Sequence, residues 1–181
     1  VPSIGKIYVA HYGDNAVHRY DTGGTLEASG WADHPHSIAA SPDGQEISAL
    51  GGRVFRFDAD LNPMGDWTHS GRAYTNFGED GRLYIGSHSQ LLYIRNADGS
   101  DHQAIASGTA DFTFGNSLYR AMSAQTAPGL GTHMFVAAAR WAGDPNDPGD
   151  TTPWWQADGG AIFEFHDPGQ RVRVLHDDLT S

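Results

Sequence analysis

The feature that most constrains the fold of this chain is an internal repeat. A short alternating strand, a turn of glycine or polar residues and a second strand recur four times along the 181 residues. The copies are KIYVAHYGDNAVHRYD (6–21), EISALGGRVFRFD (46–58), RLYIGSHSQLLYIRNADG (82–99), and HMFVAAARW (133–141) with AIFEFHDPG (161–169). Aligned on Ile7, Ile47, Leu83 and Met134, they follow one another at steps of 40, 36 and 51 residues. Because two-residue alternation is typical of half-buried strands and no segment keeps apolar residues at helical spacing, the sequence predicts an all-β fold.

Further short strands flank the copies. SIAASPDG (37–44) and YTNFGEDG (74–81) precede two of them, and each ends in Asp-Gly, a dipeptide that tolerates positive φ and closes hairpins. A last strand follows each copy, at LEASGWA (26–32), PMGDWTH (63–69), HQAIAS (102–107) and RVRVLHD (171–177). Four short strands every ~40 residues are typical of β-propeller blades. We therefore expect one β-propeller domain over 1–181, with about four four-stranded blades at approximately 1–36, 37–72, 73–110 and 111–181.

These repeats resemble those of known propeller families. KIYVAHYGDNAVHRYD followed by HPHSIAASPDG (34–44) looks like the YVTN-type repeat, and DGRLYIGS (80–87) is similar to NHL-type and gluconolactonase-like propellers. RVRVLHDDLTS (171–181) resembles the blade-closing segment of sorbosone-dehydrogenase-like propellers. The resemblance covers most of the chain except an insertion at 142–160, and it concerns the repeats rather than one protein. It implies a propeller and leaves the activity open, because such repeats serve many functions.

One blade lacks its innermost strand in this pattern. Rings of six or seven blades need roughly 240–300 residues at ~40 per blade. The sequence therefore predicts part of a ring. In order of preference, the chain is cut from a longer one, two chains complete a larger propeller, or the chain closes as an unusual four-bladed ring. An open ring exposes strand edges, which favour self-association.

Composition excludes several classes of function. The 22 acidic residues exceed the 11 Lys and Arg, and the resulting formal charge of −11 disfavours binding to nucleic acid or to anionic membranes. Cysteine is absent, which excludes disulfides, thiolate metal sites and Cys nucleophiles. The chain contains no G-x-S-x-G elbow, P-loop, H-E-x-x-H or dinucleotide fingerprint. The expected location is secreted or periplasmic.

Candidate site residues come from the loops that meet around a propeller's central channel on one face. Histidine in such a place serves as a metal ligand or an acid–base group, and arginine holds substrate oxygens. The expected catalytic residues are His34, His36, His69, His88, Arg72 and Arg140. The expected histidine ligands of a divalent metal (Ca²⁺, Mg²⁺ or Zn²⁺) are His11, His36 and His88. Gluconolactonase-like propellers hold a divalent cation with acidic and amide side chains, and that resemblance implies Asp111, Asn116 and Asp178 as further ligands.

Other polar residues of the repeats have structural interpretations. His18 falls on a strand and is interpreted as structural. Asp43, Asp80 and Asp98 each precede a glycine, and turn formation explains them better than catalysis or calcium binding does.

The insertion at 142–160 contains three Pro, four Gly, four Asp and a tandem Trp pair. Loops longer than ~12–15 residues often bind ligands or cover a site. We expect Trp141, Trp154 and Trp155 either to stack on sugar rings or to pin the loop to the propeller surface.

These observations favour an enzyme that acts on a carbohydrate-derived or lactone-like polar substrate at a channel mouth lined by His, Asp and Arg. The reaction classes that fit are metal-dependent hydrolysis of the lactonase type and sugar lyase or oxidoreductase chemistry. The alternative is a non-catalytic secreted propeller that binds carbohydrate or protein. The expected partners are a small polar or sugar-like ligand and either a second copy or the remainder of a longer chain.

Overall fold

The computed structural model of the protein describes residues 5–69, 73–87, 91–101, 103–107, 117–127, 131–141, 149, 151, 157–166 and 170–177. These residues form fifteen strands and no helix, so the all-β prediction is confirmed. The strands build four antiparallel sheets, and in each sheet the strands that pair are consecutive in the chain. No helix in the described part of the chain is long and apolar enough to cross a bilayer.

The sheets are named sheet one to sheet four in chain order. Sheet one has three strands and each of the others has four. Sheet one contains β1 (Lys6–His11), β2 (Ala16–Asp21) and β3 (Leu26–Trp31). Sheet two contains β4 (Ser37–Ala40), β5 (Glu46–Leu50), β6 (Arg53–Asp58) and β7 (Pro63–Thr68). Sheet three contains β8 (Ala73–Phe77), β9 (Leu83–Ser87), β10 (Leu91–Arg95) and β11 (Gln103–Ser107). Sheet four contains β12 (Ser117–Ala127), β13 (Gly131–Trp141), β14 (Ala157–His166) and β15 (Gln170–Asp177).

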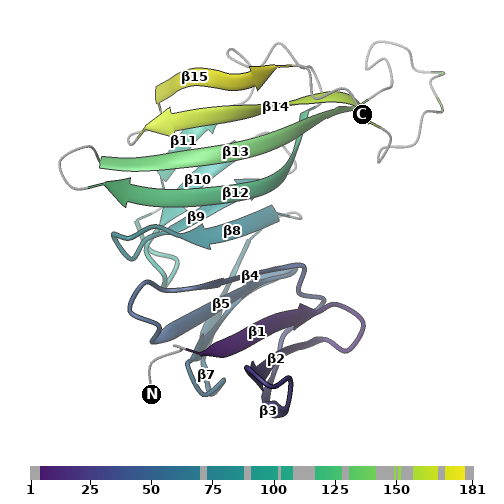
Figure 1. The fold of residues 1–181 in the computed structure, drawn as a ribbon, viewed down its shortest axis with the longest axis vertical. Helices are drawn as coiled ribbons and strands as arrows, with labels where there is room; N and C mark the ends of the chain where they lie inside the picture. The colour runs from purple at the N-terminus through teal and green to yellow at the C-terminus, as the bar shows by residue number, and fades with distance from the viewer. Residues whose placement is uncertain are drawn as a thin grey trace.

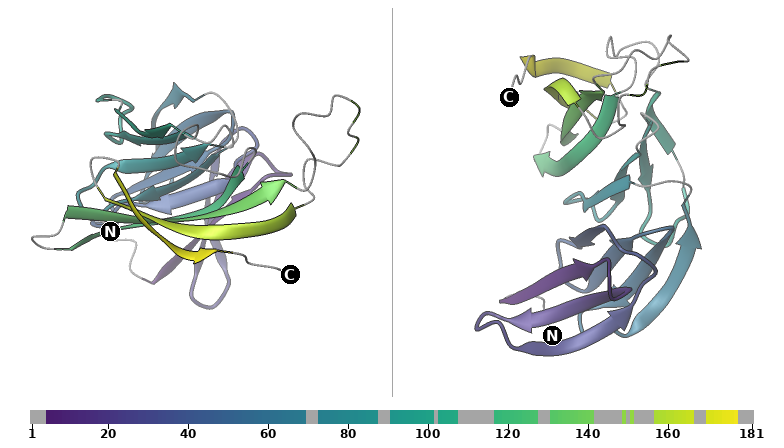
Figure 2. Two further views of the ribbon diagram at one scale, coloured as in Figure 1. Left: turned by 90° about the horizontal axis from the view of Figure 1, so that it is seen from above. Right: turned by 90° about the vertical axis from the view of Figure 1, so that its right-hand side faces the viewer.

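The sheets are stacked in chain order along the long axis of the molecule. Sheet one lies at one end and sheet four at the other, as Figure 1 and the right-hand view of Figure 2 show. The described strands therefore form no closed ring. What the fold establishes is the all-β class with four small antiparallel sheets.

The predicted insertion at 142–160 overlaps a strand. β13 ends at Trp141 and β14 begins at Ala157, so the last four residues of the insertion lie in β14, where Ala157, Gly159 and Gly160 pair with β13. Of the remainder the structure describes only Gly149 and Thr151, and the tandem Trp pair lies outside the described residues.

The same turn joins the last two strands of sheets one, two and three. Its first residue donates its N–H to the carbonyl oxygen four residues later, at 3.0 Å in each case: Asp21 to Thr25, Asp58 to Asn62, and Asn96 to Ser100. The residue before that acceptor has a positive φ in every copy: Gly24 (84°), Leu61 (64°) and Gly99 (85°). The repeat seen in the sequence is thus a repeat of turn geometry as well as of strands.

A second repeated turn joins the first two strands of sheets two and three. Asp43 accepts the N–H of Gln45 through Oδ1 at 3.0 Å, and Asp80 accepts the N–H of Arg82 in the same way at 3.0 Å. Gly44 follows at a φ of 68°. The interpretation of these aspartates as turn formers is confirmed.

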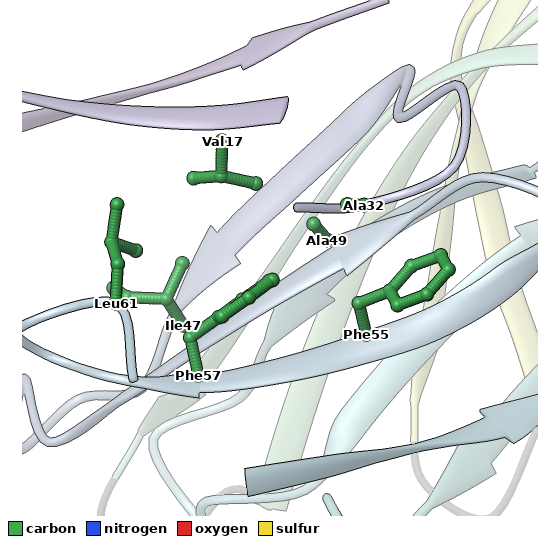
Figure 3. Close-up of a cluster of buried hydrophobic side chains, with 7 residues drawn as sticks. All are labelled: Val17, Ala32, Ile47, Ala49, Phe55, Phe57 and Leu61. Carbon is green, nitrogen blue, oxygen red and sulfur yellow. The ribbon is translucent and has the colours of Figure 1, made fainter. Parts of the chain in front are cut away.

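Two apolar clusters hold the first three sheets together. Between sheets one and two, Val17 and Ala32 lie against residues of β5 and β6 (Figure 3). Ala39, Leu50 and Val54 of sheet two pack against residues of sheet three in a second cluster. Each contact joins the face of one sheet to the facing side of the next. Burial of aliphatic side chains stabilises the stack by about 1.5–3 kcal/mol for each fully covered residue.

Polar contacts fix the orientation of sheet one on sheet two. The hydroxyl of Tyr8 and the guanidinium of Arg19 both donate to the carbonyl oxygen of Ala59, at 2.7 and 2.6 Å. Burial raises the pKa of Tyr8 above its usual value, although its hydrogen bond with Arg19 opposes the shift. Arg19 also pairs with Asp60, and that hydrogen bond raises the pKa of the guanidinium. Sheet one is therefore held on this side by both apolar and charge-assisted contacts.

Candidate metal and ligand site at the first hairpin

The hairpin of β1 and β2 brings two histidines and an aspartate together. His11 is the last residue of β1, Asp14 lies in the turn, and His18 is in β2. Val9 pairs with His18, so His11 and His18 lie on the same face of sheet one as diagonal neighbours. One ligand atom from each of the three side chains lies within 4.8 Å of the other two. We call these three residues the hairpin triad.

The carboxylate of Asp14 lies between the two imidazoles. Its Oδ2 is 3.2 Å from Nδ1 of His11 and 3.8 Å from Nε2 of His18. The two rings meet edge to face, with centroids 5.5 Å apart. Ligand atoms around a tetrahedral ion with ~2.0–2.1 Å bonds are separated by about 3.3 Å, so these distances are close to those of a metal site.

His18 is held in the orientation that a ligand requires. Its Nδ1 lies 2.9 Å from Oγ of Ser29, and its side chain is only 14% exposed. When Nδ1 carries the proton and donates it to Ser29, Nε2 keeps its lone pair on the side of Asp14. That Nε2 is buried and has no hydrogen-bond partner among the described residues. Buried polar atoms are nearly always satisfied, so this nitrogen marks a place for a ligand.

Two further histidines lie beside the hairpin triad, on the segment that connects sheet one to sheet two. The ring centroid of Tyr12 lies 4.9 Å from that of His34, which it meets edge to face. It lies 6.1 Å from the ring centroid of His36, whose ring is tilted against it. Nδ1 of His34 lies 2.6 Å from Oδ1 of Asp33, which orients the imidazole. The first hairpin thus borders a surface rich in imidazole and carboxylate groups.

Asn15 ties the hairpin turn to this connecting segment. Its side-chain oxygen accepts the N–H of His34 at 2.9 Å, and its carbonyl oxygen accepts the N–H of Ala32 at 3.0 Å. Asn15 and His34 both have positive φ, at 54° and 43°. Such backbone is uncommon outside glycine and is often found where side chains are positioned for function.

The donor set determines which cations fit. Two imidazoles and one carboxylate suit borderline divalent metals such as Zn²⁺, whereas Ca²⁺ and Mg²⁺ prefer sites built from oxygen. His11 and Asp14 are exposed, so solvent and small ligands reach the remaining coordination positions. Of the three cations that the sequence suggested, the geometry at this hairpin favours Zn²⁺.

The structure places the residues predicted from sequence in three different ways. It brings His11 into the hairpin triad and sets His34 and His36 beside it, across Tyr12. It packs the ring of His69 edge to face between Trp67 and Tyr93, where the side chain is buried. Arg140 and Trp141 lie in β13, at register opposite Gly159 and Ala157 of β14. The remaining predicted site residues lie outside the described residues: Arg72, His88, Asp111, Asn116, Trp154, Trp155 and Asp178.

Sequence reasoning missed His18 as a ligand because it lies on a strand. The available signal was the pairing register: a four-residue turn after His11 places Val9 opposite His18, and His18 therefore beside His11. Asp14, in the same turn, lies between the two imidazoles.

A concave region, separate from the hairpin triad, lies at the turns of sheets two and three. It has a volume of about 360 Å³ and includes Asp43, Glu46 and Asp80 in its lining. Three of its four carboxylates have a structural role: Asp43 and Asp80 close turns, and Glu46 accepts two hydrogen bonds from Arg56 at 2.7 and 2.9 Å. The fourth, Glu79, is exposed.

The chain was compared with known proteins. No protein-family model matches it, and no curated protein is significantly similar to it in sequence.

Proposed function

We propose that the chain is a propeller-type repeat protein that binds a divalent cation of the Zn²⁺ class at His11, Asp14 and His18 and acts there on a small polar, lactone-like substrate. The observation that carries the proposal is the convergence of these three side chains, with Nε2 of His18 buried and without a hydrogen-bond partner among the described residues. The assignment to a propeller and the proposed reaction rest on separate arguments.

The propeller assignment is supported by the repeat. Four sheets follow in chain order, each is an antiparallel meander, and two turn geometries recur from sheet to sheet. Blades of a propeller have this internal order and pack face to face around an axis. Closure of the ring is the part of the assignment that solution measurements must test.

The cation site is supported by the first hairpin and its surroundings. Ser29 lies within hydrogen-bond distance of Nδ1 of His18 and orients its ring, as hydrogen-bond partners behind metal-ligating histidines do. The exposed side chains of His11 and Asp14 leave room for a substrate oxygen next to the cation. A divalent ion bound here would polarise a carbonyl oxygen.

The protein's own side chains would position and protonate the substrate. Tyr12 and His34 lie next to the triad, and the contact of Asp33 Oδ1 with Nδ1 orients the imidazole of His34. His34 is therefore the group placed to give a proton to, or take one from, a substrate oxygen. The net charge of −11 favours neutral or cationic substrates over strongly anionic ones.

Calorimetric titration of the full chain with ZnCl₂ tests the cation site. One ion should bind per chain, and His11→Ala should weaken binding by more than the roughly 10–100-fold that follows loss of a supporting residue. His34→Ala is the matched control: it removes an exposed histidine beside the triad and should leave Zn²⁺ affinity unchanged. Equal binding by the wild type and His11→Ala would refute the site.

Hydrolysis assays on simple lactones test the reaction. Turnover should require Zn²⁺ and should fall by about 10²–10⁴-fold in His34→Ala, the usual contribution of a general acid or base. Zn²⁺ binding without turnover on any lactone would reject the enzymatic part and leave a metal-dependent binding function.

A further inference from the structure

The concave region at the turns of sheets two and three combines acidic and apolar residues. Its volume of about 360 Å³ lies within the roughly 300–1,000 Å³ typical of small-molecule sites. The turn between β4 and β5 contributes Asp43, and the turn between β8 and β9 contributes Glu79. Apolar surface comes from Pro42, Met64 and Phe77. We call this region the acidic cleft.

Two carboxylates of the acidic cleft, one from each turn, have no ion-pair partner among the described residues. The hydrogen bonds that Asp43 accepts come from neutral groups, the hydroxyl of Ser41 at 2.6 Å and the N–H of Gln45 at 3.0 Å. The hydrogen bond from Ser41 is the main cause of the lowered pKa of Asp43, so this carboxyl is ionised at neutral pH. Glu79 is exposed and has neither an ion pair nor a hydrogen bond within the described part of the chain. The cleft therefore presents two negative charges that the protein itself does not neutralise.

The arrangement of these charges suits an organic cation better than a metal ion. A metal ion needs several ligand atoms around one point, and the described residues bring three such atoms together only at the hairpin triad. In the acidic cleft Asp43 and Glu79 belong to the turns of different sheets, and Glu46 is held by Arg56. An aliphatic chain that carries positive groups matches both parts of the lining, because its carbons pack on the apolar surface while its charged ends stay at the carboxylates.

We propose that the acidic cleft binds a small aliphatic diamine, with one ammonium group at Asp43, the other at Glu79, and the carbon chain against Pro42 and Met64. The two hydrogen bonds that close the turn use Oδ1 of Asp43, so its Oδ2 accepts from the ligand. Met64 is 48% exposed, and the carbon chain would cover it. The formal charge of −11 draws cations toward the chain. The site shares no residue with the hairpin triad and is independent of the Zn²⁺ proposal.

Calorimetric titration of the metal-free full chain with cadaverine tests the site. One molecule should bind per chain, and added NaCl should weaken binding because it screens exposed charges. Pentylamine lacks the second ammonium group and should bind at least about 3-fold more weakly. Pentanediol, which has the same carbon chain and no charge, should not bind. Absence of saturable binding up to about 10 mM cadaverine would overturn the proposal, and so would equal affinity for pentanediol.

Charge-neutralising variants test the two carboxylates. Glu79→Gln should weaken cadaverine binding by roughly 3–5-fold, the effect of losing one exposed ion pair. Asp43→Asn keeps a side-chain oxygen for the turn and should weaken binding by a similar factor. Because the two positions lie in different turns, the double variant should lose roughly 10–25-fold.

Glu27→Gln is the matched control, because it makes the same change of net charge on β3 of sheet one, outside the acidic cleft. Its affinity for cadaverine should change by less than about 2-fold. Equal losses in Glu27→Gln and Glu79→Gln would show that the whole negative surface attracts the diamine and would overturn the site. Circular dichroism of each variant separates loss of binding from loss of folding.

Amide NMR of the full chain locates the bound diamine. Cadaverine should shift the backbone amides of residues 43–46 and 79–82 and leave those of residues 11–18 unchanged. Shifts confined to 11–18, or spread evenly over the acidic surface, would overturn the proposal. Since Zn²⁺ binding is measured at different residues, failure of the diamine site is distinguishable from failure of the cation site.

Discussion

Sheets one and two are built on the same repeat, but their surroundings differ. Ile7 and Val9 in β1 match Ile47 and Ala49 in β5, and the first pair is 50% and 37% exposed where the second is fully buried. Sheet two has a sheet on each side, while sheet one has a described neighbour on one side only. The difference shows that burial in this molecule is decided by the neighbouring sheet, because the alternating pattern within the strand is the same.

The comparison also explains where the candidate site lies. His11 and His18 occupy the positions that Gly51 and Phe55 hold in sheet two. At Gly51 the carbonyl oxygens of Asp33 and His34 approach the end of β5, and Phe55 is part of the apolar cluster. In sheet one no described sheet packs against these positions from the side opposite sheet two, and polar metal-ligating side chains occupy them.

The largest expected effect separates the buried and the open positions. Ile47→Ala should lower the free energy of unfolding by about 2–5 kcal/mol, because it leaves a cavity between sheets one and two. Ile7→Ala in the monomer should change it by no more than about 0.5 kcal/mol. Urea unfolding followed by circular dichroism, at protein concentrations below any dimerisation, measures both. Equal losses would show that Ile7 is covered within the single chain.

The next effect tests the close approach at the end of β5. A Cβ on Gly51 would lie 1.9 Å from the carbonyl oxygen of Asp33, so Gly51→Ala must displace the segment that carries His34. We expect Gly51→Ala to lower the free energy of unfolding by an amount at the upper end of the roughly 1–3 kcal/mol typical of overpacking. Gly52→Ala is the control, since its Cβ would meet only the Asp33 carboxylate, at 3.9 Å. Thermal unfolding measures the stability of both variants. Equal stabilities would contradict the close approach of the Asp33 carbonyl oxygen to Gly51.

A smaller effect concerns the orientation of His18. Ser29→Ala removes the hydrogen-bond partner of Nδ1 and should weaken Zn²⁺ binding by about 10–100-fold without changing the stoichiometry. Ser48→Ala, in the buried part of β5, is a serine control away from the hairpin triad and should leave affinity unchanged. Calorimetric titration measures both affinities. Unaltered Zn²⁺ affinity in Ser29→Ala would show that the hydrogen bond between Ser29 and His18 has no role in metal binding.

The smallest effect is the pH dependence of a repeated turn. Asp58 accepts hydrogen bonds from the backbone of Asp60 and from the backbone and side chain of Asn62, and the Asn62 side chain is the main cause of its lowered pKa. Because the pKa of Asp58 is lower in the folded state than its unfolded value near 3.8, the ionised carboxylate stabilises the fold at pH values above 3.8. This contribution is lost as the pH falls through the folded-state pKa. Asp58→Asn should therefore flatten the acid limb of the stability profile. Glu79→Gln, which neutralises an exposed carboxylate, is the control and should leave that limb in place.

Much of the fold follows from the sequence because local chemistry specifies it. Alternation in KIYVAH and EISAL predicts strands, and Asp43-Gly44 and Asp80-Gly81 predict turns whose hydrogen bonds and positive φ the structure displays. The hairpin triad needed the strand register, which places His18 beside His11. The exposure of Ile7 was not predictable from its own repeat, because it depends on which sheet lies opposite.

The central claim is that Nε2 of His18, a ring nitrogen of His11 and the carboxylate of Asp14 bind one cation. Nitrogen-15 NMR of the histidine side chains during Zn²⁺ titration tests it most directly. One equivalent of Zn²⁺ should shift Nε2 of His18 and one ring nitrogen of His11, leave Nδ1 of His18 protonated toward Ser29, and leave His69 unchanged. Zn²⁺-induced shifts confined to His34 and His36, or no shift at His18, would contradict the account.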